Sequence, residues 1–172
     1  IGGTNPLIYH LSSVLLHLIS STGVWFLCKR LQLPPITAFL LALLFTIHPV
    51  HSQSNYWIPS WNNPLMGLFT IAAFIYFLDY LKNPSKKLYA LHSLSGIFAL
   101  FCKETSLFLI LIFLLYGYLF SVQRRLLIRF VPAWALRLSC WMAMKSIAFA
   151  YPIPLKADTL LEALNRAWPV RS

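Results

Sequence analysis

The strongest constraint on this chain is a series of six apolar segments, of which the second, fourth and fifth are short. They lie at about residues 7–28, 36–50, 64–81, 88–102, 105–122 and 130–150. A helix that crosses a lipid bilayer needs roughly 20 predominantly apolar residues. Charged residues make up only 10% of the 172 residues, against about 25% in an average soluble domain. We therefore exclude soluble enzyme folds and expect an all-α, polytopic transmembrane helix bundle with five or six membrane segments.

The apolar run from residue 88 to residue 120 is too long for a single membrane crossing. A helix of this length would extend about 50 Å, whereas the hydrocarbon core of a bilayer is about 30 Å thick. The run is interrupted by one adjacent charge pair, Lys103 and Glu104. We expect the helix to break at this pair.

The basic residues predict how the chain is threaded. They follow the first, third and fifth segments, as Lys29, Arg30, Lys82, Lys86, Lys87, Arg124, Arg125 and Arg129, whereas the loop at 51–63 has no charge. Cytoplasmic loops of membrane proteins carry an excess of Lys and Arg. We therefore expect 29–30, 82–87 and 123–129 in the cytoplasm, and 48–64 with 103–104 outside it. The net charge of +10 is spread over several loops, so we expect the lipid bilayer as a partner and no nucleic acid.

The sixth segment has two interpretations. Arg137 and Lys145 lie inside it, and each costs about 2.5–3.5 kcal/mol at the centre of a membrane. The segment either spans the membrane or lies in the interface, with Trp134 and Trp141 at the level of the lipid headgroups. We divide the chain into a transmembrane bundle (1–122), a basic loop with this sixth helix (123–150) and an extramembrane tail of unreadable role (151–172).

A polar seam runs along the first segment. His10, Ser13, His17 and Ser20 recur at helical spacing, which places them on one face of a helix. We expect this polar face of the helix to be turned away from lipid. It is either a set of hydrogen bonds between helices or a polar path toward a buried ligand.

The richest polar run follows the second segment, at the membrane boundary. Its candidate substrate-binding residues are His48, His51, Trp57, Asn62 and Asn63. The tryptophan can stack on a sugar ring while the histidines and amides supply hydrogen bonds, or the aromatic residues belong to the interfacial belt. His48 and His51 have no third ligand nearby, so we predict no metal site.

Lys103 and Glu104 also have two interpretations. They form a mutually neutralised pair that caps the following helix, or they are substrate-binding residues. In the second case Lys103 holds a lipid phosphate as a point charge and Glu104 orients a polar group.

Three blocks of residues, taken in order, resemble a known family. They are Asn5-Pro6 with Tyr9-His10 and His17, then His48-Pro49-Val50-His51, then Phe101-Cys102-Lys103-Glu104-Thr105. Together they resemble the C-type membrane glycosyltransferase superfamily, and in particular the bacterial relatives of the O-mannosyltransferases that carry tetratricopeptide repeats. The resemblance covers about residues 3–122.

The resemblance implies an integral membrane glycosyltransferase, mannosyltransferase-like, in the bacterial plasma membrane. Such an enzyme moves a sugar from a polyprenyl-phosphate donor to an extracytoplasmic protein or glycan acceptor. Its catalytic acidic residue is expected upstream of Ile1, so we interpret the chain as a fragment that is inactive alone. We predict no cofactor for the chain, and leave a divalent metal open for the full-length enzyme. Gln53, Trp61 and Asn63 depart from the charged residues that are frequent in this family after His51.

Two other functions remain open at this stage. A transporter or flippase would use the polar seam and the Lys103–Glu104 pair to line a path through the bundle. A non-catalytic membrane scaffold would use the loop after His48 to bind a partner.

Overall fold

The computed structural model describes residues 6–49, 62–120 and 124–150. All regular structure in these ranges is helical, which confirms the expected all-α fold for this part of the chain. The chain divides into two compact units, residues 1–141 and 142–172. All contacts described below lie within the first unit.

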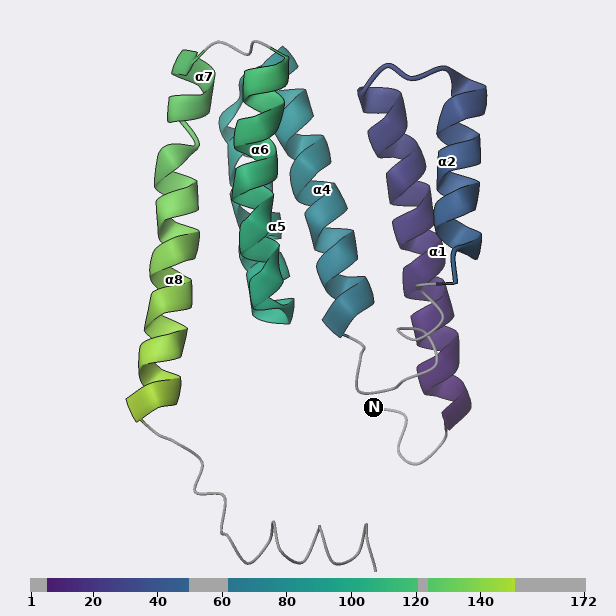
Figure 1. Ribbon diagram of the computed structural model, residues 1–172, viewed down its shortest axis with the longest axis horizontal. Coiled ribbons are helices and arrows are strands. Elements are labelled where there is room, and N and C mark those ends of the chain that lie inside the picture. Colours follow the sequence, from purple (N-terminus) through teal and green to yellow (C-terminus); the bar gives the residue numbers. More distant parts are fainter. Residues whose placement is uncertain (1–5, 50–61, 121–123, 151–172) are drawn as a thin grey trace, which may run out of the picture. The chain divides into compact units, whose positions relative to one another are not determined.

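The helices follow the apolar segments closely. They are α1 (Pro6–Arg30), α2 (Pro35–Ile47), α4 (Asn62–Lys82), α5 (Lys86–Cys102), the 3-10 helix η2 (Glu104–Leu107), α6 (Phe108–Leu119), α7 (Arg124–Ile128) and α8 (Val131–Ala150), and Figure 1 shows their arrangement. The long apolar run is broken at the expected place. Lys103 is extended, with φ −161° and ψ 133°, and separates α5 from η2.

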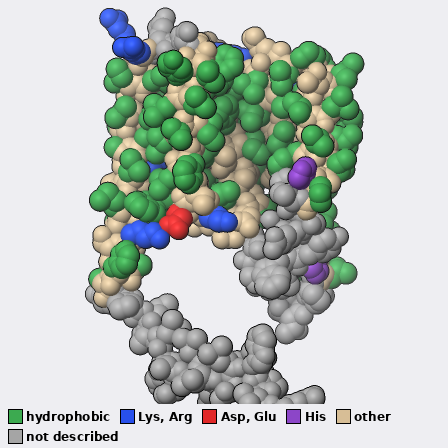
Figure 2. Space-filling model, viewed as in Figure 1, with side chains coloured by type: hydrophobic (Ala, Val, Ile, Leu, Met, Phe, Trp, Pro, Cys, Tyr) green, Lys and Arg blue, Asp and Glu red, His purple; other side chains and the backbone are tan. Residues whose placement is uncertain are grey.

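Three helical stretches in the described part of the chain are long and apolar enough to cross a membrane, namely His10–Arg30, Asn62–Lys82 and Arg124–Ala150. Two further apolar helices are shorter, namely Pro35–Ile47 and Glu104–Leu119. Large apolar side chains also remain exposed along the helices, and the face in Figure 2 is largely covered by them. Lipid removes such side chains from water, whereas a soluble protein would leave them in it. These findings indicate a multi-pass membrane protein.

The turn between α1 and α2 is a helix-ending motif. The backbone N–H of Leu33 donates to the carbonyl of Cys28 at 3.2 Å, and that of Gln32 donates to Lys29 at 3.1 Å. Gln32 adopts a positive φ of 62°, which is the left-handed conformation that ends many helices. The next helix then begins at Pro35, a residue tolerated in the first turn because its missing N–H is not needed there.

Small residues let neighbouring helices pack closely. α1 contacts both α2 and α4, and α4 contacts α5. In α2 the buried residues are Ala38 and Ala42, one turn apart. The buried residues of α5 are His92, Ser95, Gly96, Ala99 and Leu100, which form one face at helical spacing. Small residues at such positions are typical of helix interfaces in membranes.

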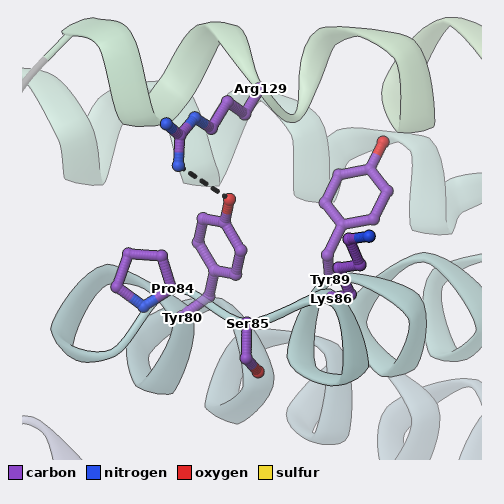
Figure 3. A pocket seen from close by; sticks show the side chains of 6 residues that line it. All are labelled: Tyr80, Pro84, Ser85, Lys86, Tyr89 and Arg129. Carbon is purple, nitrogen blue, oxygen red and sulfur yellow. Dashed lines mark hydrogen bonds between the residues drawn. The ribbon is translucent and has the colours of Figure 1, made fainter.

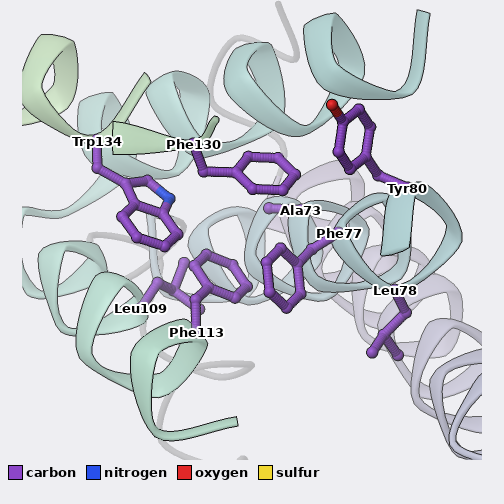
Figure 4. Packing of buried hydrophobic residues seen from close by; sticks show 8 residues of the cluster. All are labelled: Ala73, Phe77, Leu78, Tyr80, Leu109, Phe113, Phe130 and Trp134. Carbon is purple, nitrogen blue, oxygen red and sulfur yellow. The ribbon is translucent and has the colours of Figure 1, made fainter. Parts of the chain in front are cut away.

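An aromatic core joins α4, α6 and the start of α8 (Figure 4). Its buried members are Ala73, Phe77, Leu78, Tyr80, Leu109, Phe113, Phe130 and Trp134. The rings of Phe77 and Phe113 lie 4.7 Å apart, and the ring of Trp134 stacks on that of Phe113 at 6.1 Å. Trp134 is only 5% exposed. Its ring therefore packs between the helices instead of facing lipid, and its placement at headgroup level stays a prediction.

The helices of the first unit place the polar segments at two opposite ends. At the basic end, the Lys82 ammonium donates to the carbonyl of Arg30 at 3.2 Å, and Arg30 pairs with Asp79 at 3.1 Å. The basic end comprises Lys29, Arg30, Lys82, Lys86, Lys87, Arg124, Arg125 and Arg129 (Figure 1). The opposite end, called the Lys103 end, holds the start of α4 and the turn between α5 and η2. In the described part of the chain, the basic residues thus lie at one end of the bundle and Lys103 and Glu104 at the other, and which end faces the cytoplasm stays a prediction.

Candidate functional site

The backbone at the end of α5 positions Lys103. The Lys103 N–H donates to the carbonyl of Ala99 at 3.0 Å and so completes the last turn of the helix. Lys103 itself is extended, and its side chain is exposed at the end of α5. The backbone from which the Lys103 side chain extends is thus fixed at the Lys103 end.

Two predicted site residues meet at this end. The Lys103 ammonium donates to the Oδ1 atom of Asn63 at 2.8 Å, although the two residues are 40 positions apart. Asn63 is in the first turn of α4, so the bond joins the start of α4 to the end of α5. Because an ammonium group only donates, the amide oxygen of Asn63 must face it. The amide NH₂ group is then directed to other partners.

Glu104 is held by a third helix. The Trp141 indole donates from Nε1 to Oε2 of Glu104 at 3.2 Å. Next to it, the Thr105 hydroxyl donates to the sulfur of Met66 in α4 at 3.3 Å. The sequence predicts Trp141 only as an interfacial anchor, and its contact with the candidate site was not foreseen. The contacts of Lys103 and Glu104 thus connect α4, η2 and α8.

The remaining predicted substrate-binding residues are only partly covered by the structure. His48 is exposed and follows the last residue of α2, and Asn62 is exposed at the first position of α4. His51 and Trp57 lie outside the described residues. They stay predictions for the site.

The polar seam of α1 faces other helices. Ser13, His17 and Ser20 are buried and His10 is half-buried. The His17 ring donates from Nε2 to the carbonyl of Thr46 in α2 at 3.0 Å and stacks on Phe45 at 5.5 Å, while Ser20 bonds within its own helix. These contacts favour the interpretation of a hydrogen-bonded helix interface over a polar path.

The structure also reveals a buried polar contact that the sequence analysis missed. Arg137 of α8 is 2% exposed, and its Nη2 atom donates to the carbonyl of His92 at 2.9 Å and lies 3.3 Å from the His92 Nε2 atom. The His92 Nδ1 atom donates to the carbonyl of Ala73 at 3.0 Å. Since Nδ1 carries the hydrogen, Nε2 can accept one from Arg137. The contact connects α4, α5 and α8.

The described part of the chain brings together no group of three or more His, Cys, Asp or Glu side chains suited to a metal ion. Its three cysteines, Cys28, Cys102 and Cys140, are free.

The chain is distantly similar to an enzyme from the fruit fly. It is 30% identical over 107 residues to the protein O-mannosyl-transferase Tmtc1 of Drosophila melanogaster. The match covers 62% of this chain and 12% of the length of the fly protein. No family model and no solved structure matches the chain. To this extent the resemblance to O-mannosyltransferases is confirmed, as a partial and distant similarity.

Proposed function

We propose that this chain forms a transmembrane part of a glycosyltransferase, which moves a sugar from a polyprenyl-phosphate donor to a protein or glycan acceptor outside the cytoplasm. The observation that carries the proposal is the hydrogen bond between Lys103 and Asn63. It joins two segments that the sequence predicts to bind substrate, at the end of the bundle opposite the basic loops. The similarity to a protein O-mannosyl-transferase supports this class of reaction and a mannosyl donor.

Lys103 is suited to hold the phosphate of the donor. An ammonium group carries three N–H donors, and the contact with Asn63 uses one of them. The other two can donate to phosphate oxygens. Lys103 is exposed at the end of α5, which supports a contact with the phosphate of a lipid-linked donor at the membrane boundary. Lysine binds phosphate as a point charge, without demanding one geometry.

Asn63 and Glu104 are suited to bind the sugar or the acceptor. The amide oxygen of Asn63 accepts from Lys103, so its NH₂ group can donate to a sugar hydroxyl. A carboxylate has roughly four acceptor positions, and Trp141 holds one oxygen of Glu104 in place. We propose that Asn62, His48, His51 and Trp57 complete the sugar site.

The acceptor hydroxyl needs a general base during transfer. Asp79 lies at the basic end and is paired with Arg30, on the wrong side for this role. Glu104 is engaged by Trp141 at the Lys103 end. We assign the base to neither residue, and expect it in the loop upstream of Ile1 that the family resemblance implies.

The test is sugar transfer by the full-length protein from polyprenyl-phosphate mannose to a protein acceptor. We expect Lys103→Ala to lower kcat/KM by about tenfold or more, mainly through a higher KM for the donor, because a charge-assisted contact to phosphate is lost. Asn63→Ala should have a smaller effect in the same direction. Lys87→Ala removes the same charge from the basic end and is the matched control, which should leave transfer unchanged.

The outcomes separate this proposal from the other functions. Equal transfer and equal donor affinity in Lys103→Ala and Lys87→Ala would refute the assignment of the donor site. Movement of the lipid-linked sugar across the membrane without transfer would favour a flippase instead.

A further inference from the structure

A second polar site lies at the basic end, away from Lys103. It is a cavity of about 240 Å³, lined by Tyr80, Pro84, Ser85, Lys86, Tyr89 and Arg129 (Figure 3). The lining residues come from the end of α4, the turn that follows it, the start of α5 and the segment between α7 and α8. Chain segments far apart in the sequence therefore build one concave site.

The two tyrosine rings are fixed by the aromatic core. The ring of Tyr80 packs edge-on against Phe130 at 4.8 Å, and the ring of Tyr89 stacks on Phe130 at 5.7 Å. Figure 3 shows the hydroxyl of Tyr80 directed at the guanidinium of Arg129. Arg129 donates from Nη1 to this hydroxyl at 3.5 Å. The core thus holds a phenol next to a cation at the mouth of the cavity.

The cavity carries positive charge that its own walls do not neutralise. Lys86 and Arg129 both line it, and none of its described lining residues is acidic. The nearest described acid in the sequence, Asp79, is paired with Arg30. A guanidinium has five N–H donors in a planar fork, and the contact with Tyr80 uses one of them. An anion with several oxygens can therefore be bound by Arg129, Lys86 and the Tyr80 hydroxyl together.

We propose that this cavity binds the phosphate group of an anionic lipid from the leaflet at the basic end. The shared chemistry is a phosphate ester anion, which arginine binds through two parallel hydrogen bonds and lysine through its charge. The volume suits a headgroup rather than a whole lipid, whose acyl chains remain in the membrane. Tyr80 lies near the end of α4, which is long enough to cross a membrane, so the cavity lies at headgroup level. Basic pockets between transmembrane helices recognise lipid headgroups in this way.

The experiment measures lipid binding by the full-length protein in a neutral detergent. Phosphatidylglycerol is titrated onto the protein, phosphatidylcholine is titrated in parallel, and bound lipids are counted by native mass spectrometry. We expect phosphatidylglycerol to bind more tightly, and Arg129→Gln to weaken its binding by about tenfold. Arg124→Gln is the matched control, because Arg124 is exposed at the same end but does not line the cavity. Tyr80→Phe should weaken binding less than Arg129→Gln, because it removes one hydroxyl and no charge.

A competition with inorganic phosphate identifies the source of the ligand. If inorganic phosphate binds in the absence of lipid, and phosphatidylglycerol does not displace it, the ligand is a soluble phosphate and the lipid proposal is overturned. Displacement of the phosphate by phosphatidylglycerol supports the lipid. Equal losses in Arg129→Gln and Arg124→Gln would overturn the proposal, because they would show diffuse attraction to the whole basic end. Equal affinity for the two lipids would overturn it as well. Size-exclusion elution of each variant checks that the exposed Arg129 side chain is not needed for folding.

Discussion

Gly96 should be the least replaceable glycine in the described part of the bundle. A Cβ atom added there would overlap the guanidinium of Arg137, at both Cζ and Nη2. Arg137 is buried and cannot swing into solvent without leaving its place between the helices. The substitution Gly96→Ala therefore displaces the guanidinium and breaks its contacts with His92.

The size of the effect follows from three terms. A lost hydrogen bond from a charged donor costs about 1.5–3 kcal/mol. Crowding in a packed interior costs about 1–3 kcal/mol. Alanine favours a helix over glycine by up to about 1 kcal/mol, which acts in the opposite direction. We expect the free energy of unfolding to fall by about 1.5–5 kcal/mol, since the first two terms together exceed the third.

The measurement is unfolding of the full-length protein by SDS in mixed micelles, followed by tryptophan fluorescence. Gly67→Ala is the matched control, because a Cβ atom at Gly67 of α4 would meet no atom within 4 Å. The double variant Gly96→Ala with Arg137→Ala tests the cause, since removal of the guanidinium should make the alanine less costly. If Gly96→Ala unfolds like Gly67→Ala, the guanidinium does not occupy the space beside Gly96 and the reasoning is refuted.

Three further predictions concern polar contacts between helices. His92→Leu should lower the free energy of unfolding by about 2–3 kcal/mol, because it removes one acceptor of the buried Arg137. Arg137→Met should change the free energy of unfolding by less than about 1 kcal/mol. The lost hydrogen bonds are offset by removal of a buried charge whose Nε and Nη1 atoms have no hydrogen-bond partner. A larger loss of stability in Arg137→Met than in His92→Leu, measured by SDS unfolding, would contradict this reasoning. His17→Leu should lower the free energy of unfolding by about 1 kcal/mol in the same assay, because it removes the hydrogen bond from His17 in α1 to Thr46 in α2. An unchanged midpoint would show that this bond adds no stability.

The helices could be predicted from the sequence because a helix that crosses a bilayer needs a run of roughly 20 apolar residues. The first segment was expected at 7–28 and is helical over Pro6–Arg30, and the third was expected at 64–81 and is helical over Asn62–Lys82. The ends differ by about two residues, because polar residues such as Asn62 and Arg30 can take the terminal turns without entering the apolar layer. The break at Lys103 follows from the same length argument.

The contacts between helices could not be predicted in the same way. The sequence predicts both Lys103 and Asn63 as site residues, but their bond spans 40 positions and depends on how α4 and α5 pack. His92 was missed because a single histidine in an apolar helix gives no periodic signal. The small residues Ser95, Gly96 and Ala99 on its own helix face were the available clue. Its partner Arg137 is 45 positions away. From the sequence, Arg137 is only a charge that is costly to place at the centre of a membrane.

The central claim is that sugar transfer takes place at the Lys103 end of the bundle. The most direct measurement is transfer by the full-length protein in sealed vesicles of known orientation, with polyprenyl-phosphate mannose in the membrane and an impermeant acceptor peptide added outside. The account predicts transfer only when the face that carries Lys103 and Asn63 is outward, and its loss in Lys103→Ala. Transfer only when the basic end is outward, or full transfer in Lys103→Ala, would contradict it.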